Sequence, residues 1–327
     1  MSRASLEGSI EGSLLSSPVG APSMPAVAPG SVAAWAMALR PRSLVIAVSP
    51  VVAAIALIWA RGSAIDPVLA LVVFVVAVMM QVITNLQNDV GYTTRGAEHR
   101  GKRIGLPRAT GLGLLTPAQV RVAIGVAILF TLFLGLPLVL LRGVPAVLIG
   151  GASILAALAY MGGPRPIAYT PLGEPTVLLF FGLVAVVGTD FALTGTFDDP
   201  SLWIAGTALG AIATAAIMVN NSRDWEHDRE VGRRTLAVVV GRRAMDSLFA
   251  AMVLGPLVLM LPLAWTMQSA WLLLPTLLLL PSCIRLVRDF GECPPGLPYN
   301  AILFRTFLME LKFAGLLAIG AVLARVA

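Results

Sequence analysis

The chain has 327 residues, of which 57% are hydrophobic and only 12% are charged, and its formal net charge is +6. A mean hydropathy of +0.88 over this length excludes a soluble globular domain. We therefore predict a polytopic membrane protein whose positive charge serves topology and contact with the lipid bilayer, with no nucleic-acid partner.

The N-terminal segment is rich in Ser, Pro and Gly and has no apolar core. It lacks the apolar run of a signal peptide, and its single Arg3 is too little basic charge for a transit peptide. We predict a disordered cytosolic tail over residues 1–31 and a transmembrane domain over residues 32–327.

Nine apolar runs have the length that crosses a bilayer. Helices satisfy their own backbone hydrogen bonds in lipid, and the runs are too long for barrel strands, so we predict an all-α bundle of nine transmembrane helices. The predicted spans are residues 44–60, 66–88, 120–141, 144–161, 175–197, 202–221, 246–265, 269–287 and 303–325.

Lys and Arg are unevenly shared between the two sides of these spans. With the N-terminus in the cytosol, the opposite side holds only Arg61, Arg142 and Arg325, and the large basic clusters fall in cytosolic loops. This bias follows the positive-inside rule. We expect a protein of the bacterial inner membrane with its active site facing the cytosol.

A polar motif, NLQND at residues 85–89, closes the second span. Asn85 and Asp89 are four residues apart and share a helix face, with Asn88 beside them. An isolated motif of this kind is usually a solvated helix end. A second copy at the same membrane depth would favour a binding site.

That second copy is NNSRD at residues 220–224, at the close of the sixth span. The second and sixth spans run in the same direction, so their ends can meet on one side of the membrane. We predict that Asn220, Asp224 and Asp228 form one unbroken i, i+4, i+8 stripe on a helix.

Several carboxylates brought together repel one another, and a divalent cation removes that penalty. Carboxylate and carboxamide oxygens suit Mg²⁺, which keeps positions for water and phosphate oxygens. The Arg and Lys residues of the adjoining loops would match the remaining phosphate charge. The residues alone thus predict a site for Mg²⁺ and an anionic ligand.

The second motif and its continuation, NNSRDWEHDREVGRRTLAVVVG at residues 220–241, resemble the second aspartate motif of the UbiA superfamily of membrane prenyltransferases. The resemblance is closest to the 1,4-dihydroxy-2-naphthoate prenyltransferase branch, which makes menaquinone precursors. Four further segments resemble this branch: NLQNDVGYTTRG at 85–96, RIGLPRATGLG at 103–113, RPRSL at 40–44 and GGPRPIAYTPLGEPTVLLFFGLVAVVGT at 162–189.

The resemblance implies transfer of a polyprenyl group from its diphosphate to an aromatic acceptor. It implies Mg²⁺ ligation by Asn85, Asn88, Asp89, Asp224 and Asp228, with the three aspartates and Glu98 as catalytic residues. The substrate-binding residues that we expect are those two amides together with Arg40, Arg42, Lys102, Asn220, Asn221, Arg223, Arg234, Tyr160 and Tyr169.

One position departs from the family pattern. The family usually continues its first motif with a second acid, and this chain has Tyr92 there. We predict that Glu98 supplies the missing charge.

Two alternatives stay open at this point. The acceptor could be another hydroxylated aromatic, such as 4-hydroxybenzoate or homogentisate. Because Tyr92 replaces an acid, the chain could also be a non-catalytic lipid-binding or transport protein on the same scaffold.

Overall fold

The structure is a computed structural model, and it describes residues 27–96, 105, 107–294 and 296–327. Within these residues nine helical segments are long and apolar enough to cross a membrane, which confirms the predicted all-α fold and its nine spans. The segments are Val32–Ala60, Pro67–Thr94, Pro117–Arg142, Val144–Met161, Gly173–Thr194, Pro200–Arg223, Leu236–Thr266, Ala270–Glu292 and Tyr299–Val326.

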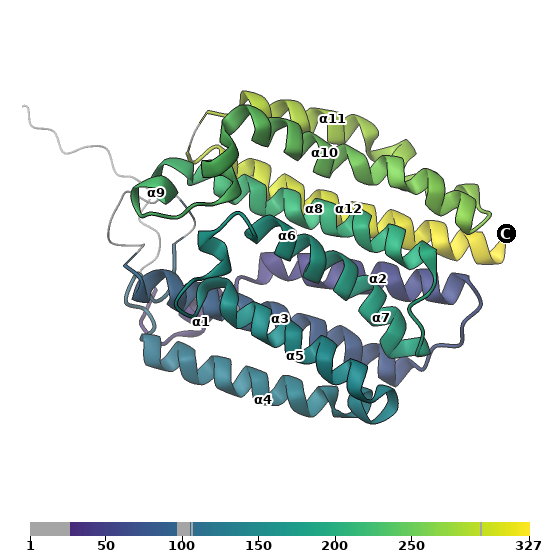
Figure 1. The fold of residues 1–327 in the computed structure, drawn as a ribbon, viewed down its shortest axis with the longest axis horizontal. Coiled ribbons are helices and arrows are strands. Elements are labelled where there is room, and N and C mark those ends of the chain that lie inside the picture. The colour runs from purple at the N-terminus through teal and green to yellow at the C-terminus, as the bar shows by residue number, and fades with distance from the viewer. Residues whose placement is uncertain (1–26, 97–104, 106, 295) are drawn as a thin grey trace, which may run out of the picture.

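The spans lie side by side, and most are single helices, whereas the first, fifth and eighth are composite (Figure 1). The single helices are α3 (Pro67–Thr94), α4 (Pro117–Arg142), α5 (Val144–Met161), α8 (Pro200–Arg223), α10 (Leu236–Thr266) and α12 (Tyr299–Val326). The first span joins α1 (Val32–Leu39), η1 (Pro41–Leu44) and α2 (Val45–Ala60), the fifth joins α6 (Gly173–Val177), η3 (Leu178–Val184) and α7 (Ala185–Thr194), and the eighth joins η4 (Ala270–Leu273) and α11 (Leu274–Glu292).

Two short helices lie outside the spans, η2 (Ile167–Tyr169) and α9 (Trp225–Glu230). They belong to the end of the bundle where α3 and α8 finish, which we call the motif end. We call the opposite end, where α2 finishes and α3 begins, the far end. In Figure 1 the motif end is on the left, beside α9, and the far end is on the right, beside the C-terminus.

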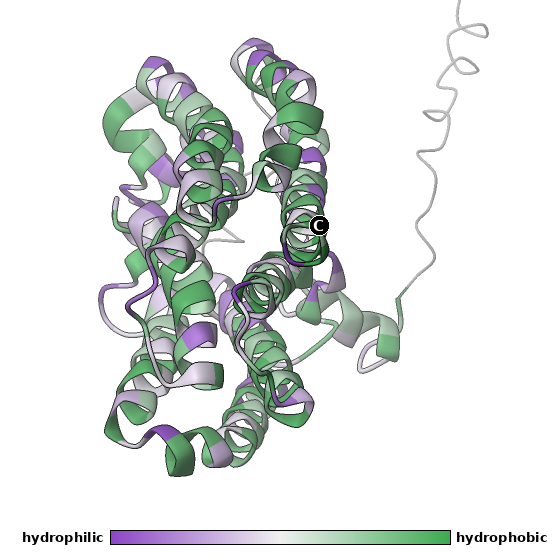
Figure 2. Ribbon diagram, turned by 90° about the vertical axis from the view of Figure 1, so that its right-hand side faces the viewer, coloured by the Kyte–Doolittle hydropathy of each residue, from purple (hydrophilic) through white to green (hydrophobic). Residues whose placement is uncertain are grey.

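Hydrophobic residues cover the outside of the bundle as well as its interior, as expected for helices in lipid (Figure 2). Inside, α8 is the central helix and packs against η3, α10 and α12, while α3 packs against α4 and α5. Helix α2 contacts α12, α7 and α3, and it therefore connects the helices around α8 with those around α3.

Glycines let α8 approach the fifth span closely. A Cβ on Gly182 would lie 2.5 Å from the Cα of Gly210, and one on Gly210 would lie 2.6 Å from the Leu178 carbonyl oxygen. Small residues allow such backbone contact between membrane helices. On the fifth span the contact falls in the π-helical segment η3, whose Phe180 and Phe181 both line the cavity described below.

The seventh span is longer than the predicted range 246–265. In the structure α10 begins at Leu236, and a break at Gly241, which has a positive φ of 75°, separates its first turn from the long helix. Only glycine adopts such a backbone readily. The hydrophobic pattern missed this turn because Arg242, Arg243 and Asp246 separate it from the apolar run.

Candidate active site

A cavity of about 930 Å³ runs through the bundle from the motif end toward the far end. On α3 its lining extends from Val73 to Asn88, roughly 22 Å of helix. Most of the lining side chains are apolar, and the polar ones gather at the motif end, with the exception of Thr131, Arg142, Ser153 and Thr189. The shape suits a long apolar ligand with one polar end.

Two arginines lie at the polar end of the cavity, at the turn between α1 and η1. Arg40 ends α1 in a left-handed conformation, with φ 52° and ψ 64°, which costs a residue with a Cβ about 1–2 kcal/mol. Strain of this kind is often found at functional sites. Arg42 lies with its guanidinium carbon 4.8 Å from the centroid of the Phe304 ring, and it makes no ion pair among the described residues.

Asn85 joins this turn to α3. Its amide nitrogen donates to the Leu39 carbonyl oxygen (2.8 Å) and to Ser43 Oγ (2.9 Å), and its Oδ1 accepts from Gln81 Nε2 (3.1 Å). Gln81 and Ser43 also line the cavity, and neither was expected from the motifs. The sequence did contain one signal for Gln81, because a glutamine one turn before Asn85 is unusual in an apolar helix.

Asn88 is the member of the first motif with an unsatisfied atom. It lines the cavity, and its buried Oδ1 has no hydrogen-bond partner among the described residues. A buried acceptor without a donor is costly. A cation or a donor group of a ligand at the polar end of the cavity would satisfy it.

Asp89 points away from the cavity lining. Its carboxylate accepts hydrogen bonds from the Ala109 N–H (2.9 Å), the Thr110 N–H (2.9 Å) and the Thr110 hydroxyl (2.6 Å). The side chain is 1% exposed. In this structure Asp89 therefore fixes the segment after the first motif to the end of α3.

The second motif contributes one amide to the cavity. Asn220 lines it, whereas Asn221, the next residue, donates from Nδ2 to Glu174 Oε1 on α6 (2.8 Å). Arg223 donates to both carboxylate oxygens of Asp224 at 2.9 and 2.8 Å. Arg223 also donates to Asn300 at the start of α12 (2.7 Å).

The predicted unbroken stripe from Asn220 to Asp228 is wrong. Helix α8 ends at Arg223, Asp224 has a non-helical backbone with φ −99° and ψ 9°, and α9 begins at Trp225. The bidentate pairing of Asp224 with its neighbour Arg223 accompanies the break. Asp228 still donates its N–H to the Asp224 carbonyl oxygen (2.8 Å), so the two acids stay near one another.

Asp228 and Arg233 form a buried ion pair at 2.5 Å. Arg233 also donates to the Ala168 carbonyl oxygen at 3.0 Å, which ties α9 to η2. The backbone N–H of Arg234 donates to the Tyr169 carbonyl oxygen (3.0 Å), and the Arg234 side chain is exposed outside the cavity lining. Arg234 therefore has no contact with the cavity in this structure.

Three of the tyrosines at the motif end lie together. Tyr160 lines the cavity, whereas Tyr92 and Tyr169 pack beside it and face arginines. The guanidinium carbons of Arg108 and Arg233 lie 4.5 and 5.1 Å from the centroid of the Tyr92 ring. Tyr92 thus occupies the position of the missing acid as an aromatic ring in contact with two cations.

We expect Tyr92→Phe to keep the melting temperature and turnover close to the wild type, because the ring and its two cation contacts remain. Tyr92→Leu removes the ring and should lower stability by about 1–3 kcal/mol. Thermal unfolding in detergent measures both changes. A Phe variant as unstable or inactive as the Leu variant would assign the essential role to the hydroxyl.

The described residues contain no group of three His, Cys, Asp or Glu side chains placed to hold a metal ion. Two of the expected site residues, Glu98 and Lys102, lie outside the described residues. Among the described residues, the oxygen ligands available around the cavity include the carboxamides of Gln81, Asn88 and Asn220, and Asp224 follows Asn220 by one helical turn.

The arrangement of apolar cavity, paired asparagine motifs and basic polar end agrees with comparisons against known proteins. Residues 47–295 match the model of the UbiA prenyltransferase family. The chain belongs to this family. It is therefore a membrane-embedded prenyltransferase.

Two relatives of this UbiA chain are named 1,4-dihydroxy-2-naphthoate octaprenyltransferase. The protein from Escherichia coli K12 is 35% identical over 231 residues, which covers 69% of this chain and 74% of the relative. The protein from Mycobacterium leprae is 34% identical over 239 residues, covering 72% of this chain and 80% of the relative.

Solved structures share the UbiA fold. A UbiA homolog from Archaeoglobus fulgidus bound to GPP and Mg²⁺ has a TM-score of 0.66 at 12% identity, covering 88% of this chain and 99% of that chain. The apo structure of a homolog from Aeropyrum pernix K1 has a TM-score of 0.64 at 13% identity, covering 86% and 97%. These likenesses support the fold of the chain independently of the sequence motifs.

Proposed function

We propose that this prenyltransferase moves a polyprenyl group from its diphosphate to 1,4-dihydroxy-2-naphthoate, with loss of CO₂, in menaquinone synthesis. The observation that carries the proposal is the cavity, whose apolar body suits a prenyl tail and whose polar end suits a diphosphate. The names of the two relatives support the acceptor.

The polar end offers cations for the diphosphate. Arg40 and Arg42 line it, and Arg42 has no carboxylate partner among the described residues, so its guanidinium can pair with phosphate oxygens. Lys102, Arg223 and Arg234 were also predicted to contact the diphosphate. In the structure Arg223 instead pairs with Asp224, and Arg234 is exposed, so Arg40 and Arg42 are the stronger candidates.

The same end fits Mg²⁺. The Asn88 oxygen lacks a partner, Asn220 lines the cavity, and both present the hard oxygen ligands that Mg²⁺ prefers. We propose that these amides hold the ion together with Asp224, which would exchange Arg223 for the metal. Asn85, Asp89 and Asp228 remain predicted ligands, although each is occupied by protein partners in this structure. When bound, Mg²⁺ supplies positive charge to the leaving diphosphate.

The chain's own residues then act on the developing charges. As the allylic C–O bond breaks, Arg40 and Arg42 stabilise the negative charge on the diphosphate, and the apolar cavity keeps water from the prenyl cation. The Tyr160 ring lies on the cavity wall at this end and can face that cation. The ring carbon that carries the carboxylate forms the new C–C bond, and CO₂ and diphosphate leave without a redox partner.

The purified protein in detergent tests this function. Geranyl diphosphate is incubated with 1,4-dihydroxy-2-naphthoate, with and without Mg²⁺, and the prenylated product, CO₂ and diphosphate are measured. We expect equal amounts of the three products, and only with Mg²⁺. Faster prenylation of 4-hydroxybenzoate or homogentisate would overturn the assigned acceptor, and diphosphate release without any prenylated product would overturn the transfer.

We also propose that the motif end faces the cytosol of a bacterial inner membrane. The basic residues near Thr94 and after Arg223 support this orientation. Cysteine labelling from each side of sealed vesicles, at the exposed Arg234 and Ala64 positions in turn, would determine it.

A further inference from the structure

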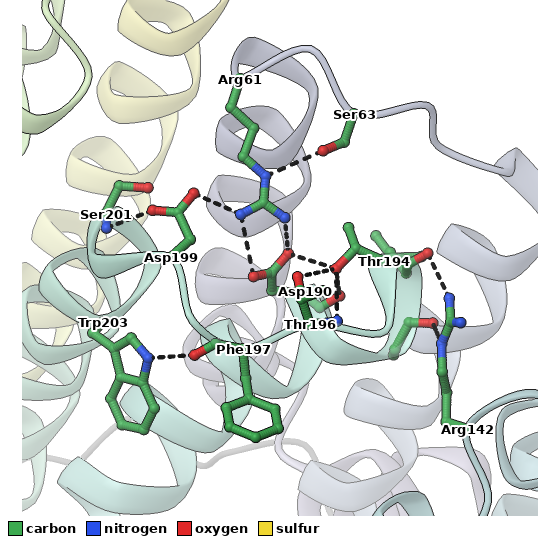
Figure 3. A network of polar contacts seen from close by, with 12 residues as sticks. Arg61, Ser63, Arg142, Asp190, Thr194, Thr196, Phe197, Asp199, Ser201 and Trp203 are labelled. Atoms are coloured by element: carbon green, nitrogen blue, oxygen red, sulfur yellow. Dashed lines mark hydrogen bonds and ion pairs between the residues drawn. The ribbon is translucent and has the colours of Figure 1, made fainter.

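A polar network closes the bundle at the far end (Figure 3). Arg61, just after α2, pairs with Asp190 on α7 and with Asp199 before α8, the latter at 2.6 Å. Burial raises the pKa of the Asp199 carboxyl, but hydrogen bonds from Ser201 and Arg61 outweigh it and hold the pKa below its usual value. These ion pairs thus tie α2, α7 and α8 together.

Arg142 extends this polar layer to α4. Its Nε donates to the Ala192 carbonyl oxygen (2.9 Å) and its Nη2 to the Leu193 carbonyl oxygen (2.7 Å), at the C-terminal end of α7. Unlike the Arg61 network, Arg142 also lines the cavity. It is the lining residue of α4 nearest the far end, and we call its side chain, held by these carbonyl groups, the Arg142 wall.

Just before this wall the cavity is lined by small residues. Gly188 on α7 lies beside α5, where an added Cβ would be 3.9 Å from Ile149 Cγ2, an ordinary contact. Gly135 on α4 has nothing within 4 Å of a built Cβ. Both positions keep space open that a larger side chain would occupy.

Hydrophobic burial cannot select the length of a prenyl tail here. The tail leaves lipid for a cavity that is equally apolar, so each added carbon gains little free energy. Tail length can still be selected by steric fit, because packed protein interiors resist overfilling. The end of an apolar tail is also excluded from the Arg142 wall, since entry would separate a guanidinium from its carbonyl partners.

We infer that the far end of the cavity sets the longest prenyl chain that the enzyme accepts, with Gly135 and Gly188 providing room for the tail's last units and Arg142 providing the stop. The inference rests on the proposed function, because it assigns the cavity to the prenyl tail. It assigns Gly135, Gly188 and Arg142 to the selection of the donor's chain length. The roles proposed for the residues at the polar end stay the same.

The narrowing test uses Gly188→Leu and Gly135→Leu. For each purified variant, kcat/KM is measured with a series of prenyl diphosphates from geranyl upward and one acceptor. We expect kcat/KM for the longest chain that the wild type accepts to fall about tenfold relative to geranyl. The control is Gly125→Leu, also on α4, where a Cβ has open space but the residue is outside the cavity lining.

The opposite test widens the cavity with Arg142→Ala, which should extend the accepted series toward longer chains. Its control is Arg325→Ala, because Arg325 is also at the far end and donates to the Trp59 carbonyl oxygen but does not line the cavity. Gly188→Ala is the milder substitute if a Leu variant fails to fold, as its Cβ fits without displacement.

Opposite shifts in the two tests, with both controls unchanged, support the inference. The same length profile in wild-type, narrowed and widened proteins overturns it, while the wild type's activity leaves the proposed function standing. No turnover of any prenyl diphosphate by the wild type overturns the proposed function and this inference together.

Discussion

Asp224→Asn is expected to lower turnover about 100-fold or more while leaving the fold intact. The change keeps the size of the side chain and removes the charge that would hold Mg²⁺ against the diphosphate, and loss of such an electrostatic stabiliser typically has this magnitude. In the structure it also weakens the bidentate pairing with Arg223. Turnover is measured as a function of Mg²⁺ concentration.

Asp289→Asn is the matched control for this prediction. Asp289 pairs with Arg305 at 2.5 Å, but neither residue lines the cavity. Because the pair is substantially exposed, we expect a stability change below about 1 kcal/mol and wild-type turnover. Near-normal turnover of Asp224→Asn at limiting Mg²⁺ would remove Asp224 from the metal site and leave it a structural role that includes its pairing with Arg223.

The nine spans were predictable because composition and run length are enough to identify helices in lipid. The cavity-facing amides were predictable in part. The motif pointed to Asn88 and Asn220, which line the cavity, but equally to Asp89 and Asn221. Adjacent helical residues differ in direction by about 100°, and only the packing of the bundle decides which one faces the cavity.

Long-range contacts account for the rest of the difference. The sequence does not reveal that residues 109 and 110 return to the end of α3, which turns the Asp89 carboxylate toward backbone N–H groups. It also gives no local reason for α8 to end at Arg223, since that break coincides with side-chain contacts to Asp224 and to Asn300, 77 residues later. Hydrophobic periodicity carries no information on such polar contacts.

Asp89→Asn should also lower turnover about 100-fold, and the comparison with Thr110→Val separates two roles of this carboxylate. As a metal ligand, Asp89 would have to leave the Ala109 and Thr110 donors, and its loss would raise the Mg²⁺ concentration needed for half-maximal turnover. As an anchor, it holds the segment after the first motif through three hydrogen bonds.

Thr110→Val removes only the hydroxyl that donates to Asp89 at 2.6 Å and keeps the carboxylate. One hydrogen bond to a charged group contributes about 1.5–3 kcal/mol to stability, so the Val variant should melt earlier. Its Mg²⁺ dependence should match the wild type, because the charge is still present. If both variants lose stability and neither changes its Mg²⁺ dependence, Asp89 acts as an anchor and the metal is held by Asn88 and the second motif. A Mg²⁺ requirement that rises in Asp89→Asn alone assigns the carboxylate to the metal, and the segment at residues 109–110 then releases it when the substrate binds.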